Sequence, residues 1–100
     1  MNEFDKRQLA IMIQKIHAFN KGSLHLSDLI YDLEALLNIL TNKDQHWKDL
    51  FMGYWWDLEQ VYATALDDEK KCLDFENQKI VDYAIENLKK LVEIKLNYLD

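Results

Sequence analysis

The chain contains no proline and only two glycines, Gly22 and Gly53, among its 100 residues. Hairpin turns depend on these residue types, so their scarcity argues against a protein built from β-hairpins. A single cysteine, Cys72, cannot form an internal disulfide, and we expect a reduced thiol in a cytoplasmic protein. No apolar run is long enough to span a membrane, and the apolar stretch at residues 9–13 is too short for a secretory signal.

The residues that are abundant favour helices. Apolar residues make up 49% of the chain, enough for a folded core, and leucine, isoleucine, lysine and acidic residues are frequent. We therefore expect residues 1–100 to form one helical domain, an all-α compact bundle of four main helices.

Capping residues separate the expected helices. Gly22 can take the left-handed conformation that ends a helix, while Ser27, Asp44 and Asp74 can accept hydrogen bonds from the free N–H groups at a helix start. The four helices then cover residues 5–19, 28–40, 46–66 and 75–98. Connections this short favour antiparallel neighbours.

Apolar residues recur at i, i+3 and i+4 in each expected helix, which is the pattern of one core-facing stripe. In residues 46–66 this stripe includes Leu50, with Trp55 at its edge. The residues that we expect to be core across the chain are Leu33, Leu37, Phe51, Leu58, Val81 and Leu88.

Trp56 falls outside this pattern. At about 100° per residue it points away from the stripe, toward Asp49 and Gly53. A large ring in that position packs against something, either a partner protein or another helix of the same chain. In the second case the helix is central and Gly53 lets its neighbour approach closely. The sequence leaves both explanations open.

The acidic residues are concentrated in the middle of the chain. The net charge is −6, but residues 22–69 hold ten acids and two bases, whereas residues 1–21 hold two acids and four bases and residues 70–100 hold six of each. Nucleic-acid binding depends on a basic patch, so direct binding to nucleic acid is not expected. The acidic middle favours a basic protein partner, although acidic surfaces also serve solubility alone.

The candidate binding residues come from the two middle helices. Opposite the leucine stripe of residues 28–40, a tyrosine is bordered by two aspartates, an arrangement common at recognition surfaces and also found at ordinary exposed positions. Together with the residues around the unusual tryptophan, the expected partner-binding set is Asp28, Tyr31, Asp32, Asp49, Trp56 and Asp57.

No catalytic motif is present in the sequence. The three histidines lie in different segments and form no metal-ligand pair, and there is no nucleophile elbow or glycine-rich phosphate loop. Asp28 and Asp32, four residues apart, could in principle do acid–base chemistry, but on an outer helix face they are better explained as surface charge. We expect no enzyme activity, no cofactor and no metal.

The spaced leucines and aromatic residues between residues 24 and 66 resemble those of small all-helical immunity proteins from bacterial polymorphic toxin systems, contact-dependent growth inhibition in particular. The resemblance is carried by Leu29-Ile30-x-Asp32-Leu33-Glu34-x-Leu36-Leu37, Trp47, Phe51 and Trp56-x-Leu58-Glu59-x-x-Tyr62-Ala63. It implies a non-enzymatic cytoplasmic protein that binds and neutralises a toxin domain, often a basic nuclease such as a tRNase. The alternative is a homodimeric structural or regulatory protein with Trp56 at its self-interface.

Overall fold

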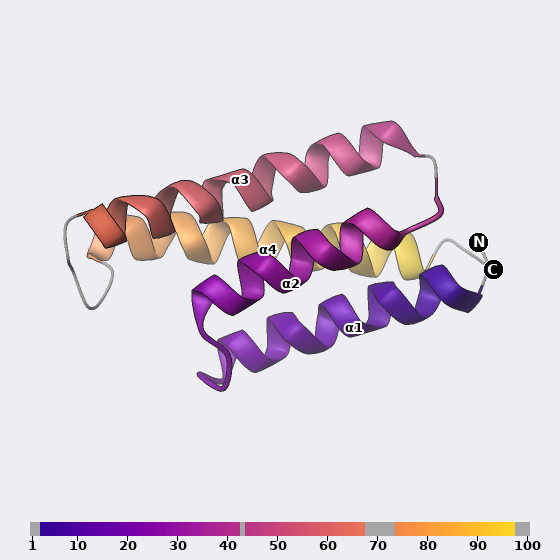
Figure 1. The fold of residues 1–100 in the computed structure, drawn as a ribbon, viewed down its shortest axis with the longest axis horizontal. Coiled ribbons are helices and arrows are strands. Elements are labelled where there is room, and N and C mark those ends of the chain that lie inside the picture. The colour runs from indigo at the N-terminus through magenta and orange to yellow at the C-terminus, as the bar shows by residue number, and fades with distance from the viewer. Residues whose placement is uncertain (1–2, 43, 68–73, 98–100) are drawn as a thin grey trace.

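The described part of the protein consists of four antiparallel helices. The computed structural model describes residues 3–42, 44–67 and 74–97, so Cys72 and Tyr98 lie outside the described residues. The described ranges contain no strand. Their four helices are α1 (Glu3–Asn20), α2 (Leu26–Ile39), α3 (Gln45–Asp67) and α4 (Phe75–Asn97). Each helix packs against the next along the chain, and α4 also packs against α1 (Figure 1). The expected all-α four-helix bundle is confirmed.

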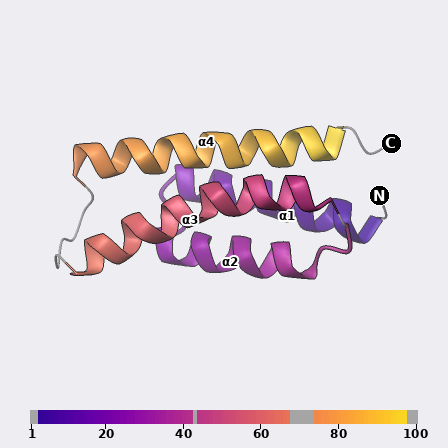
Figure 2. The ribbon, with the colours of Figure 1, turned by 90° about the horizontal axis from the view of Figure 1, so that it is seen from above.

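The helices differ in length, and this sets the shape of the bundle. α3 and α4 have 23 residues each, whereas α1 has 18 and α2 has 14. The end of α3 and the start of α4 therefore extend past the α1–α2 connection (Figure 2). Phe75 and Ile80, near the start of α4, are exposed. None of the described helices has the length and apolar character needed to cross a membrane.

The core is built from the expected stripes. All six residues predicted to be core are buried, and so is Trp55. The prediction for Leu50 is wrong, because 43% of this residue is exposed. Leu50 lies two helical turns before the exposed Asp57, on the same side of α3. It is therefore at the solvent edge of the apolar stripe, which is wider than the part of α3 that the neighbouring helices cover.

Trp56 lies outside the core. It is 53% exposed, and its ring centroid lies 6.0 Å from that of Trp55. Beyond the backbone of α3 itself, a Cβ placed on Gly53 would meet no atom of the described residues within 4 Å, so none of the other three helices approaches there. The explanation that α3 is a central helix buried on two sides is therefore wrong; α3 has one buried stripe, and Trp56 is on its outer side.

Three of the four predicted helix-end residues are confirmed. The carboxylates of Asp44 and Asp74 accept hydrogen bonds from backbone N–H groups three residues later, and Gly22 has a φ of 82° after the end of α1. Ser27 is not an N-cap: α2 starts at Leu26, and the preceding His25 makes no side-chain capping bond. Ser27 instead lies inside the first turn of α2, one residue past the start of the helix and two past the N-cap position.

Two buried tryptophans fix α3 to both of its neighbours. The Trp47 Nε1–H donates to the carbonyl oxygen of Leu91 in α4 at 3.0 Å. The Trp55 Nε1–H donates to the carbonyl oxygen of Ile30 in α2 at 2.8 Å. Each ring thus satisfies its one polar group while burying its apolar body, which gives α3 a defined rotation against α2 and α4.

Candidate protein-binding groove

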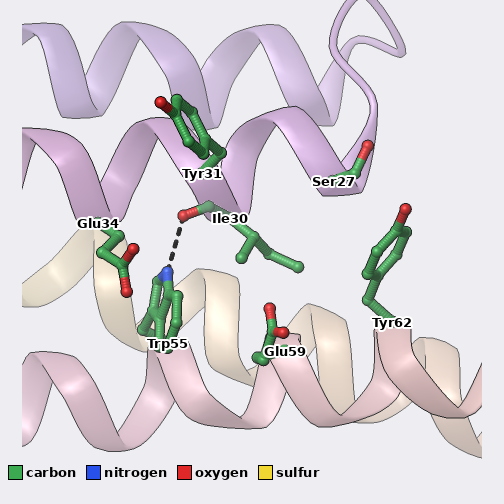
Figure 3. Close-up of a pocket in the computed structure, with 7 residues that line it drawn as sticks. All are labelled: Ser27, Ile30, Tyr31, Glu34, Trp55, Glu59 and Tyr62. Atoms are coloured by element: carbon green, nitrogen blue, oxygen red, sulfur yellow. Dashed lines mark hydrogen bonds between the residues drawn. The ribbon is translucent and has the colours of Figure 1, made fainter.

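A groove runs along the outer surface between α2 and α3, with a volume of about 320 Å³ (Figure 3). Its lining combines aromatic rings with two glutamates. The residues that line it are Ser27, Ile30, Tyr31 and Glu34 from α2 and Trp55, Glu59 and Tyr62 from α3.

The floor of the groove is held in place by a hydrogen bond between the two helices. Trp55 is buried, and its indole N–H donates to the Ile30 carbonyl oxygen across the two helices that form the groove (Figure 3). Because this bond fixes the ring, the floor cannot rearrange without breaking a buried hydrogen bond, which costs about 1–3 kcal/mol. The groove is therefore a preformed feature of the fold.

Glu34 and Glu59 are the two charged residues in the lining, and they come from opposite helices. Both are partly buried, and both carboxylates point into the space between α2 and α3, with Trp55 between them in Figure 3. Neither forms a hydrogen bond or ion pair with any residue that the structure describes. Two partly desolvated carboxylates without a cation beside them favour a cationic ligand.

Aromatic residues surround the two carboxylates. Tyr31 is 72% exposed on the α2 side, and Tyr62 points from α3 toward Ser27 at the start of α2 (Figure 3). Trp56 extends the aromatic surface on the outer side of α3, next to Trp55. Exposed tyrosine and tryptophan rings with charges nearby are typical of protein-recognition surfaces.

The two helices that form the groove also carry the acidic excess. α2 contains three acids and no lysine or arginine, and α3 contains four acids and one lysine. By contrast, α1 has two acids and three bases, and α4 has four of each. The acidic middle of the sequence therefore lies in the two neighbouring helices that form the groove.

The structure separates the six predicted binding residues. Tyr31 lines the groove, and Trp56 lies beside it against Trp55. Asp32 instead faces α1, where its Oδ2 lies 3.2 Å from the Lys15 Nζ.

The remaining three aspartates stand away from the groove lining. Asp28 lies one turn before Asp32, on the same side of α2. Asp49 lies two turns before Trp56 and accepts a hydrogen bond from Gln45 at 2.8 Å. Asp57 follows two residues after Trp55, which places it on the far side of α3. Their role in binding stays a prediction.

Sequence reasoning missed Glu34 and Glu59 as site residues. A signal for both was present: Glu34 follows Tyr31 by three residues, and Glu59 follows Trp55 by four, so each shares a helix face with an aromatic residue of the groove. What the sequence could not show is that these two faces meet across one groove.

The polar contacts at the start of α3 are structural. The Lys95 Nζ donates to Asp44 Oδ2 at 2.7 Å. This hydrogen bond holds the pKa of Asp44 below its ordinary value, and the backbone N–H of Trp47 acts in the same direction. Within residues 3–42, 44–67 and 74–97, no three histidine, cysteine or acidic side chains gather in a way that could hold a metal ion.

Comparison with known proteins gives no match: no family model, curated protein or solved structure matches this chain. The observations on which a function can be proposed are the groove, its aromatic lining and the charge of the two helices that form it.

Proposed function

We propose that this chain is a non-enzymatic binding protein that holds a basic protein partner on the α2–α3 side of the bundle. The observation that carries the proposal is the groove itself, in which Glu34 and Glu59 approach from opposite helices without a cationic partner among the described residues. A basic partner would supply the missing positive charge, and the field of α2 and α3 would steer its approach.

The exposed aromatic rings would supply most of the remaining affinity. Tyr31 and Trp56 expose apolar surface on either side of the groove, and tyrosine and tryptophan are enriched among residues that dominate binding energy. The charged residues then set the choice of partner and the association rate, whereas the rings slow dissociation.

The class of partner follows from the resemblance to immunity proteins. It implies a toxin domain of the same bacterial lineage, and a nuclease fits because enzymes that bind nucleic acid carry a basic surface. In this proposal the chain acts in the cytoplasm, uses no cofactor, and neutralises the toxin by occupying its basic surface.

The test uses the protein encoded by the gene immediately upstream of this one, because toxin and immunity genes are expected to be neighbours. This upstream product is expressed with and without this chain, and growth and binding are measured. We expect growth arrest that the wild-type chain relieves. An upstream product that neither arrests growth nor binds this chain overturns the proposal.

Charge-reversal variants locate the binding side. The double variant Glu34→Lys/Glu59→Lys is expected to lose binding and protection. The matched control Glu76→Lys/Glu93→Lys changes the charge equally on exposed positions of α4 and is expected to retain both. Equal loss in both variants would reject the groove as the site.

Ionic strength provides a second readout. If the acidic side steers the partner, the association rate should fall steeply between low and high salt, because exposed charges are screened over about 10 Å near 0.1 M. A rate that does not change with salt would reject steering.

Sedimentation of the protein alone tests the homodimer, which requires self-association.

A further inference from the structure

We propose that the α2–α3 groove is a receptor for a single arginine side chain of the partner. This inference rests on the proposed function for the existence of that partner, and it identifies which group of the partner enters the groove. It starts from three features that occur together: two carboxylates, an aromatic floor and an open apolar volume.

The placement of the carboxylates selects for a forked cation. Glu34 and Glu59 belong to different helices and flank the same space, with Trp55 between them (Figure 3). A guanidinium is planar and presents five N–H donors in directions that can serve two carboxylates at once. A lysine ammonium is a compact, strongly hydrated point charge, which gains less from carboxylates on two sides.

The aromatic residues add a second reason for arginine. Trp55 lines the groove, and tryptophan is the best ring for a cation–π contact, which arginine makes more often than lysine. The hydrogen bond to Ile30 already holds the ring in position. The apolar stem of an arginine can lie along Ile30 and Tyr62 while its charged end reaches the glutamates.

Another hollow, formed by described residues of the bundle, lacks this combination. It lies between α1 and α4, with a volume of about 270 Å³, and its lining consists of Ala10, Ile13, Glu93, Leu96 and Asn97. It thus contains one carboxylate and no aromatic ring. This hollow serves as an internal control, because a probe that recognises only a carboxylate, or only apolar surface, would also bind there.

The test is an NMR titration of the ¹⁵N-labelled full chain with N-acetylarginine N-methylamide. We expect saturable shifts of the Trp55 indole N–H and of the Glu34 and Glu59 amides, and no shifts around Glu93. The lysine analogue should bind at least about tenfold more weakly, a difference of about 1.4 kcal/mol. The citrulline analogue, which has nearly the same shape without the charge, should not bind.

Two double variants show whether the glutamates hold the probe. Glu34→Gln/Glu59→Gln keeps side-chain size and should abolish the saturable shifts, while Glu76→Gln/Glu93→Gln, which removes the same charge from α4, should leave them unchanged. Far-UV circular dichroism of both variants should match the wild type. Equal binding of the arginine and citrulline analogues, or equal binding of the lysine analogue, overturns the inference.

The outcomes separate this inference from the proposed function. If the upstream gene product binds and the Glu34→Lys/Glu59→Lys variant does not, but the arginine probe causes no shift, the arginine receptor is wrong and the basic partner stands. If the probe binds in the groove and the upstream product does not bind the chain, the proposed toxin partner is wrong and the receptor stands.

Discussion

Trp55 and Trp56 are adjacent in the chain but have opposite environments. Trp55 is 7% exposed and binds the Ile30 carbonyl, whereas Trp56 is 53% exposed on the outer side of α3. A rotation of about 100° per residue separates the two directions. One ring therefore serves the fold, and the other is available to a partner.

Alanine substitution should distinguish the two rings. Trp56→Ala is expected to change the free energy of unfolding by about 1 kcal/mol or less, because much of the ring is already in water. The same change should weaken partner binding by about 2 kcal/mol or more. Trp55→Ala, the matched control, should cost about 3–5 kcal/mol of stability. Denaturant unfolding measures the stability change of both variants. A large loss of stability for Trp56→Ala would place that ring in the core.

Asp5 is a buried acid that connects two distant segments. It is 1% exposed, and its two carboxylate oxygens accept hydrogen bonds from the Thr41 backbone N–H at 2.9 Å and hydroxyl at 2.8 Å. The start of α1 is thereby joined to the segment between α2 and α3. Burial of a carboxylate is tolerated here because its oxygens are bonded.

Removing this carboxylate should destabilise the bundle. Asp5→Ala is expected to lower the free energy of unfolding by about 2–3 kcal/mol, since a hydrogen bond to a charged group contributes about 1.5–3 kcal/mol and Thr41 loses its acceptor. Glu3→Ala, an exposed acid in the same turn, is the control and should change stability by about 0.5 kcal/mol or less. Equal effects in urea unfolding would contradict the role of Asp5.

Residue burial could be predicted where the helical pattern was apolar and dense. Leu33, Phe51 and Leu58 sit near the centre of their stripes, and all three are buried. Asp5 precedes Leu9 by four residues and so continues the α1 stripe, but its partner Thr41 lies 36 residues away and no local pattern reveals it. The prediction for Leu50 is wrong because a helical wheel does not show how much of the apolar stripe the neighbouring helices cover.

At the scale of elements, α3 has polar bonds to both of its neighbours. Trp55 joins it to α2, and near its first turn Trp47 and Asp44 join it to α4. Lys95 reaches both, since its Nζ binds Asp44 and lies 5.7 Å from the centre of the Trp47 ring. These bonds determine which side of α3 faces the groove.

The ion pair between Lys95 and Asp44 makes the stability of the fold depend on pH. Because the Lys95 hydrogen bond depresses the pKa of Asp44, the stabilisation is present above the ordinary carboxyl pKa and is lost as pH falls through the lower folded value, below about pH 4. Lys95→Met should therefore raise the pKa of Asp44 toward its ordinary value. An NMR titration of the Asp44 carboxyl measures this, and an unchanged midpoint would contradict the assignment.

Helix boundaries could be predicted where a cap was in place. Asp44 and Asp74 precede α3 and α4 directly, and both cap as expected. Ser27 was a plausible cap by residue type, but α2 begins one residue before it, at Leu26. The backbone turn at His25 and the burial of Leu29 determine that start, and tertiary packing outweighs a capping preference of about 1 kcal/mol.

On the scale of the whole molecule, the acidic segments of the sequence and the balanced or slightly basic segments form different sides of the bundle. The acidic middle segments pack side by side as α2 and α3, while the helices with balanced or slightly basic charge form the other side. The fold class and helix order follow from periodicity and short connections. The pairing of Asp32 with Lys15 could not be predicted, because it depends on the rotation of α2 against α1.

The most direct test of the account is the footprint of the upstream gene product on the ¹⁵N-labelled chain. We expect the amide and indole signals that shift or broaden to belong to the outer faces of α2 and α3, centred on Tyr31, Glu34, Trp56 and Glu59. Signals from Tyr83 and Ile94, two exposed residues of α4, should remain unchanged. A footprint centred on α4, with the α2–α3 groove unaffected, would contradict it.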